Sequence, residues 1–121
     1  MIIHGLFGSS DNWGTLGKKF SETNTVYLID QRNHGHSNHD NIMNYDVMAE
    51  DLMELINEEN IIDPILLGHS MGGKTAMRFT QKFPLVLAKL IVADIGVKKY
   101  SMHHNHIIEG LNSIDLNIVK S

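Results

Sequence analysis

The sequence contains no cysteine, which excludes two classes of site at once. Without thiols the chain can form neither a disulfide framework nor a thiolate metal centre. It also has no long apolar run, so we predict no transmembrane helix, and no charged-then-apolar leader precedes the first motif. We therefore expect a soluble protein, and the lack of cysteine is compatible with a reducing, cytoplasmic location.

An excess of positive charge is missing as well. Ten lysines and arginines stand against fourteen aspartates and glutamates, giving a net charge of −4 with no basic run. Such a chain lacks the cluster of positive charge that binds nucleic acid or an anionic membrane surface, so we expect neither as a partner. Its 121 residues are enough for one domain with a real core.

What the sequence does contain is a glycine–serine–glycine pattern between an apolar run at residues 65–67 and a helical segment. Gly68, Ser70 and Gly72 form a G-x-S-x-G nucleophile elbow. A tight strand-to-helix turn leaves no room for side chains two residues before and two residues after the serine, and glycine removes that collision. We predict that Ser70 is a nucleophile and that the Met71 amide, at the helix start, faces a developing oxyanion. The alternative is a chance match in a glycine-bearing loop, and the flanking strand and helix argue against it.

A second loop near the start of the chain fits the same chemistry. Residues 1–3 are typical of the end of a buried strand, and His4-Gly5-Leu6-Phe7-Gly8 follows it. A loop of this kind supplies the second amide of an oxyanion hole, and we predict that Leu6 donates it. We interpret His4 as a structural histidine bonded to nearby backbone rather than as a catalytic residue.

Apolar runs and helical patterns alternate along the chain. The runs are residues 1–3, 25–30, 65–67 and 90–93. This alternation predicts the α/β class, with right-handed crossovers and helices on both faces of a parallel sheet. We expect about four strands, with residues 65–67 in the interior of the sheet.

Three helices are predicted between these strands. Ser10 caps the first, and one face, expected to pack on the sheet, carries Trp13, Leu16, Gly17 and Phe20. Asn44 caps the second, whose inward side carries Met48, Leu52, Leu55 and Ile56. The third follows Ser70 and ends near Phe83, because Pro84 disfavours the helical region for the residue before it. In the polar loop after residue 30, Asp30 and Arg32 are expected to hold the loop by hydrogen bonds.

Four separated motifs stand in the order and spacing of a known family. They are His4-Gly5-Leu6-Phe7-Gly8-Ser9, Asp30-Gln31-Arg32-Asn33-His34-Gly35-His36-Ser37, Gly68-His69-Ser70-Met71-Gly72-Gly73-Lys74 and Ala93-Asp94-Ile95. The sequence resembles the α/β-hydrolase superfamily, and within it the bacterial YbfF-type esterases. The resemblance implies hydrolysis of acyl esters or thioesters through an acyl-serine intermediate. It also implies that Asp94 is the acid that orients a histidine, the alternative being a carboxylate that caps the following turn.

The ends of the chain depart from this family. Its members have strands before the position of Met1 and continue past Ser121, through a cap, to the histidine that serves as general base. His103, His104 and His106 follow Asp94 too closely for that place, and His69 should point to the opposite side of the strand end from Ser70. We therefore expect residues 1–97 to be a partial hydrolase core, residues 98–121 to begin a cap or lid segment, and the general base to lie outside this chain. The three clustered histidines lack a supporting carboxylate, so we expect no metal site and no cofactor.

Three functions fit these motifs. The first is a serine hydrolase, an esterase or thioesterase, that is incomplete in this chain. The second is a non-catalytic binding protein or a decayed fragment of the same fold. The third is another enzyme of the fold, such as a lyase or a haloperoxidase-like enzyme, because fold does not determine function. An oxyanion loop beside an intact elbow favours chemistry over binding.

Overall fold

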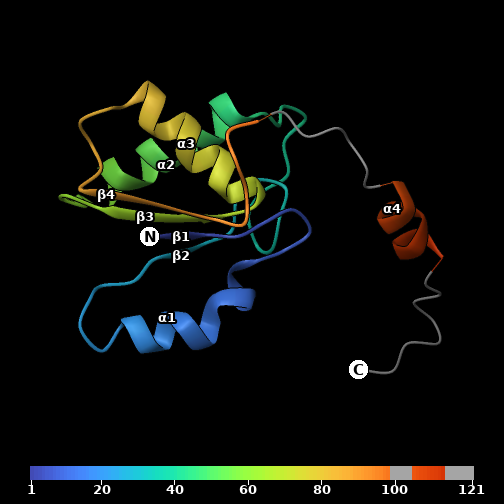
Figure 1. Ribbon diagram of the computed structural model, residues 1–121, viewed down its shortest axis with the longest axis horizontal. Coiled ribbons are helices and arrows are strands. Elements are labelled where there is room, and N and C mark those ends of the chain that lie inside the picture. Colours follow the sequence, from blue (N-terminus) through green and yellow to red (C-terminus); the bar gives the residue numbers. More distant parts are fainter. Residues whose placement is uncertain (99–104, 114–121) are drawn as a thin grey trace.

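The computed structural model describes residues 1–98 and 105–113, and its strands form one sheet with helices on both sides (Figure 1). In chain order the elements are β1 (Ile2–Ile3), the 3-10 helix η1 (Ser10–Trp13), α1 (Gly14–Phe20), β2 (Leu28–Ile29), α2 (Tyr45–Glu58), β3 (Ile65–His69), α3 (Met71–Lys82), β4 (Lys89–Ala93) and α4 (Asn105–Asn112). The predicted α/β class is confirmed.

The sheet has the strand order β2-β1-β3-β4, and every pairing is parallel. Strand β3 lies between β1 and β4, so the prediction of four strands with residues 65–67 inside is confirmed. Parallel strands end at the same edge, which brings together the loops that follow β1, β2, β3 and β4. His4, Asp30, Ser70 and Asp94 are the residues that follow those four strands.

Strand β2 is shorter than the sequence predicts. The apolar run covers residues 25–30, whereas only Leu28 and Ile29 form the strand. Its one neighbour in the sheet is β1, which contributes only Ile2 and Ile3 to the ladder. Because only two residues of β1 pair with this segment, the remaining residues of the run at 25–30 have no partner in the ladder there.

Helices α2 and α3 cover one face of the sheet and enclose the main core (Figure 1). The buried members of this core are Ile3, Ala49, Leu52, Ile56, Leu66, Ala76 and Phe79. The predicted cap of α2 is confirmed, because Asn44 Oδ1 accepts hydrogen bonds from the amides of Asp46 and Val47. Helix α3 ends at Lys82, one residue before Phe83, as predicted from Pro84.

Helix α1 lies on the opposite face (Figure 1), where the predicted cap is wrong and the predicted packing is only partly right. The N-cap is Ser9 rather than Ser10: Ser9 has extended backbone and its amide donates to Asn12 Oδ1. The amide of Ser10 instead donates to Asp30 Oδ1 at 2.6 Å. On the helix itself only Gly17 is buried, against Leu28. The side chains that should have packed on the sheet, Leu16 and Phe20, remain 48% and 41% exposed.

Candidate active site

Ser70 lies between the end of β3 and the start of α3 in a strained backbone conformation. Its φ and ψ are 51° and −114°, outside the regions that residues with a side chain normally occupy. The Ser70 amide donates to the carbonyl oxygen of Ala93 at 3.0 Å, and the Ser70 carbonyl accepts from the amide of Lys74 at 3.2 Å. The turn is therefore held on one side by the end of β4 and on the other by the first turn of α3.

The two glycines of the motif are required by close backbone contacts. A Cβ atom added to Gly68 would lie 2.3 Å from the carbonyl oxygen of Gly72. A Cβ atom added to Gly72 would lie 2.5 Å from the carbonyl oxygen of His4 and 2.6 Å from that of Ile3. Because all of these neighbours are backbone atoms, they cannot rotate away. The steric reason that the sequence pattern suggested for both glycines is confirmed.

The loop after β1 passes directly beside Ser70. A Cβ atom on Gly5 would lie 3.2 Å from Ser70 Cβ, so the backbone at Gly5 lies close to the serine. The amide of Gly8 donates to the carbonyl oxygen of Gly5 at 3.0 Å, which closes residues 5–8 into a turn. The amide of Gly72 donates to the carbonyl oxygen of His4 at 3.1 Å. The structure thus attaches the segment that contains Leu6 to the helix start that contains Met71.

His4 is a buried structural histidine, as predicted. Its side chain is 1% exposed, and Nδ1 lies 2.8 Å from the carbonyl oxygen of Gly5. Nε2 accepts a hydrogen bond from the amide of Gln31 at 3.1 Å. A carbonyl needs a donor and an amide needs an acceptor, so the ring is neutral with its proton on Nδ1. Burial lowers the pKa of His4, in agreement with a neutral ring.

Asp94 follows β4 at the same edge of the sheet as Ser70. Its φ is 56°, and its side chain is 85% exposed. One carboxylate oxygen lies 3.7 Å from His69 Nε2, which is an ion-pair distance only if that ring is protonated. The carboxylate is thus accessible from the carboxyl edge of the sheet.

His69 is oriented toward other partners than Ser70. Its ring packs edge-on against Trp13 with a centroid distance of 6.0 Å, and Nε2 faces Asp94. Among the histidine side chains that the structure describes, all within residues 1–98, none forms a hydrogen bond with the Ser70 hydroxyl. His103, His104 and the side chain of His106 lie outside the described residues.

The polar loop after β2 is held by the hydrogen bonds that were expected of Asp30 and Arg32. Asp30 accepts from the amides of Ser10 and His36 at 2.6 and 2.9 Å. Burial by itself raises the pKa of Asp30, but these amide hydrogen bonds outweigh it and the pKa is lowered. Arg32 forms a bidentate pair with Asp51, at 2.6 and 2.5 Å.

Sequence reasoning missed Gln31, which lies in the same loop. The side chain is 5% exposed and bonds to both His4 and Thr75. A glutamine after a strand carries no signal of burial, because glutamine is mostly exposed in proteins. Its partners are 27 and 44 residues away along the chain.

A hollow of about 470 Å³ is lined by Gly5 and His69, the two residues that lie next to Ser70 in space and in sequence, respectively. Residues of the loop after β1 form one wall, and Asn12, Trp13, Leu16 and His69 form the other. Its volume is in the range of small-molecule sites. Trp13 and Leu16 make the wall opposite the loop largely apolar.

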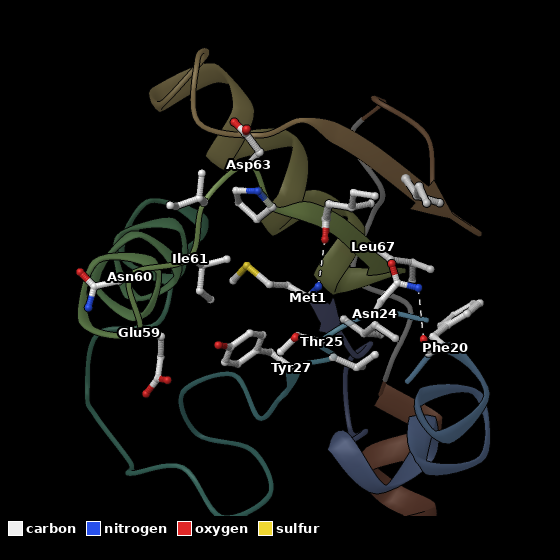
Figure 2. Close-up of a pocket in the computed structure, with 16 residues that line it drawn as sticks. Met1, Phe20, Asn24, Thr25, Tyr27, Glu59, Asn60, Ile61, Asp63 and Leu67 are labelled. Atoms are coloured by element: carbon white, nitrogen blue, oxygen red, sulfur yellow. Dashed lines mark hydrogen bonds between the residues drawn. The ribbon is translucent and has the colours of Figure 1, made fainter. Parts of the chain in front are cut away.

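A somewhat larger cavity, about 520 Å³, lies elsewhere (Figure 2). It is lined at the amino ends of the strands by Met1, Tyr27, Ile61, Ile65 and neighbouring residues. In Figure 2 the Met1 amino group donates to the carbonyl oxygen of Ile65, at 2.9 Å. The elbow and Asp94 are at the carboxyl ends of the strands, so we place the candidate site at the smaller hollow.

In the described part of the chain, no helix is long and apolar enough to cross a membrane. No group of three histidine, aspartate or glutamate side chains there could hold a metal ion.

Comparisons with known proteins agree with this geometry. Residues 1–116 match the family model described as the alpha/beta hydrolase fold. The chain is 46% identical over 115 residues to a Haemophilus influenzae protein named as an esterase/lipase, and 36% identical over 115 residues to esterase YbfF of Escherichia coli. Each alignment covers 94% of this chain, but only 40% and 45% of the two relatives. A solved esterase structure from a marine microorganism is 48% identical with a TM-score of 0.90, covering 99% of this chain and 48% of that one.

The chain therefore spans less than half the length of these relatives. The matched residues include all four motifs that carried the resemblance to YbfF-type esterases. The parallel strand order agrees with the fold that those motifs imply, and the elbow lies between β3 and α3, as its motif predicts. This chain belongs to the α/β-hydrolase fold family.

Proposed function

We propose that this chain carries the nucleophile and oxyanion-binding part of a serine hydrolase that cleaves acyl esters or thioesters. The observation that supports it most directly is the strained Ser70, whose φ of 51° is held by bonds to β4 and α3. Backbone strain in such a residue lowers the free energy of unfolding by about 1–3 kcal/mol, and strained residues of this kind cluster at active sites. The named relatives, an esterase/lipase and esterase YbfF, suggest the same reaction class.

In the proposed reaction the Ser70 oxygen attacks the acyl carbon while its proton passes to a general base. The carbonyl oxygen becomes an oxyanion, the alcohol or thiol leaves with a proton, and water then releases the acid from the acyl-serine. Asp94 is the proposed acid that orients the base. His69 faces Trp13 and Asp94, so we assign the base to a histidine that this chain does not contain.

The proposed oxyanion donors are the amides of Leu6 and Met71. Met71 begins α3, so its amide has no acceptor within the helix. The next amide, that of Gly72, is already bonded to His4. Leu6 follows Gly5, whose backbone lies close to Ser70. We expect the two amide nitrogens within about 5 Å of each other, facing one point near the serine hydroxyl. A crystal structure of the protein with a tetrahedral boronate on Ser70 measures this separation, and amides on opposite sides of the boronate contradict it.

The substrate group beside the serine should be small and apolar. The hollow has an apolar wall from Trp13 and Leu16, and neither lysine nor arginine is among its described lining residues. We further propose that residues 98–121 begin a segment that covers this hollow, whereas residues 1–97 form the core.

The test is an ester assay in four chains with p-nitrophenyl acetate. The first pair is this chain and its Ser70→Ala variant. The second pair is a longer chain, which extends past Ser121 to a histidine after another strand, and the Ser70→Ala variant of that longer chain. Loss of one triad member typically leaves a reaction rate only about a thousandfold above the uncatalysed rate in water. The short chain should therefore be close to inactive. The longer chain should be active, and Ser70→Ala should remove that activity.

Ser21→Ala is the matched control, because Ser21 is an exposed serine bonded only locally to the carbonyl oxygen of Lys18. It should leave activity unchanged. Activity in the longer chain that survives Ser70→Ala contradicts the proposed function. Strong activity in the short chain that disappears with Ser70→Ala would instead place a base within these 121 residues.

A further inference from the structure

A buried chain of hydrogen bonds connects the loop after β1 to helix α3. It runs through the side chain of Gln31, which is 5% exposed, to Thr75, which is fully buried. Gln31 Nε2 donates to the carbonyl oxygen of His4 at 2.8 Å. Thr75 Oγ1 donates to Gln31 Oε1 at 2.9 Å.

The direction of these bonds follows from the partners. The carbonyl oxygen of His4 can only accept, so it must face the Nε2 end of the glutamine. The Oε1 end then faces Thr75, whose hydroxyl is the donor. A reversed amide would place two oxygen atoms 2.8 Å apart in a buried site. Gln31 is therefore held in one orientation.

Both ends of this chain reach the residues around Met71. The carbonyl oxygen of His4 accepts a second hydrogen bond from the amide of Gly72, the residue after Met71. The hydroxyl of Thr75 also lies 3.3 Å from the carbonyl oxygen of Met71 itself. Gln31 thus adds a bridge to the direct bond between His4 and Gly72.

The His4 ring extends the same network toward Leu6. Its Nδ1–H donates to the carbonyl oxygen of Gly5, the residue before Leu6. Its Nε2 accepts from the backbone amide of Gln31. The backbone amide of Gln31 therefore binds the His4 ring, and the side chain of Gln31 binds the His4 carbonyl oxygen.

We propose that Gln31 is a positioning residue that sets the separation between the Leu6 amide and the Met71 amide. The proposal rests on the proposed function, because it takes these two amides as the oxyanion donors. Gln31 is buried and does not line the hollow beside Ser70, so it acts through the backbone and not on the substrate.

The expected consequence is a loss in turnover. Oxyanion donors must lie about 2.7–3.1 Å from one point, and a misplacement of about 1 Å in a catalytic geometry can cost about a hundredfold in rate. The oxyanion forms only after attack, so a misplaced donor should lower kcat and leave KM nearly unchanged. A merely structural role would lower the amount of folded protein without this split.

The kinetic test uses the longer chain that carries a general base. Gln31→Leu and Thr75→Val each break the bridge, and Thr75→Ser keeps the hydroxyl. The matched control is Thr80→Val, because Thr80 lies in the same helix and bonds to the carbonyl oxygen of Ala76 outside the network. We expect kcat to fall about tenfold to a hundredfold in Gln31→Leu, and by a smaller factor in Thr75→Val, with KM within about twofold. Thr75→Ser and Thr80→Val should keep the original kcat, and an unchanged kcat in Gln31→Leu overturns the proposal.

A second test needs no enzymatic activity and uses this chain alone. Amide hydrogen exchange of Gly72 reports the bond to His4 directly. In Gln31→Leu it should accelerate about tenfold or more relative to the core amides of α2, which report global opening. Equal acceleration of Gly72 and the α2 amides, or none, overturns the proposal. If the unaltered longer chain has no esterase activity, the proposed function fails, and this exchange test still decides whether Gln31 holds the loop on the helix.

Discussion

Replacing Gly68 by alanine would put a methyl carbon 2.3 Å from the carbonyl oxygen of Gly72 and 2.6 Å from its carbonyl carbon. Restoring a contact of 3.0 Å to that oxygen requires a shift of about 0.7 Å in backbone that β3, β1 and α3 hold together. Forcing extra volume into a well-packed site costs about 1–3 kcal/mol. We expect a value near the upper end, about 2–3 kcal/mol, because the neighbours are backbone atoms.

For a chain of this size, each kcal/mol lowers the unfolding temperature by about 3–5 °C. Gly68→Ala should therefore lower it by about 6–15 °C, measured by circular dichroism during heating. The matched control is Gly14→Ala at the start of α1, where an added Cβ meets nothing within 4 Å and φ is already −53°. This change should raise the free energy of unfolding by about 0.5 kcal/mol, since alanine loses less backbone entropy than glycine. A Gly68→Ala protein within about 2 °C of the unaltered chain would refute the packing argument.

Three more predictions follow from individual contacts. Asn44→Ala removes the cap of α2 and should lower the free energy of unfolding by about 1 kcal/mol in urea titrations, whereas exposed Asn57→Ala on the same helix should not lower it. Burial lowers the pKa of His4, so the unfolded chain binds a proton at higher pH than the folded chain does. Stability should therefore fall as pH drops below about 6.5, and His4→Asn should flatten this dependence in melts between about pH 7.5 and 5.5. For Asp30 the lowered pKa contributes stability above about pH 4 that is lost as pH falls further, and an Asp30→Asn protein whose acid denaturation is unchanged would contradict this.

Much of the fold follows from local rules. The apolar runs at residues 1–3, 65–67 and 90–93, the cap at Asn44 and the helix end before Pro84 depend on neighbours within one or two turns, and the structure agrees with each. The elbow belongs to this class only in part. The requirement for Gly68 comes from Gly72, four residues away, whereas the requirement for Gly72 comes from the carbonyl oxygens of Ile3 and His4 at the end of β1. The roles of Ser70, Met71, Leu6 and Asp94 are chemical assignments drawn from that pattern and from the family resemblance, and they stay predictions.

Where the sequence interpretation failed, a distant partner decided the outcome. Ser10 has the chemistry of a helix cap, but Asp30 holds its amide and Ser9 is the cap. Residues 25–30 have the composition of a full strand, but the short β1 can pair only two of them.

The sequence by itself determined the order of strands and helices, the place of the elbow and the membership of the family, because these depend on local periodicity, steric exclusion and motif spacing. Only the tertiary structure decided which polar side chains are buried and what they hold. Gln31 is the clearest case: it bridges residues 27 and 44 positions away, and such contacts exist only after β1, β2 and α3 have met at one edge of the sheet.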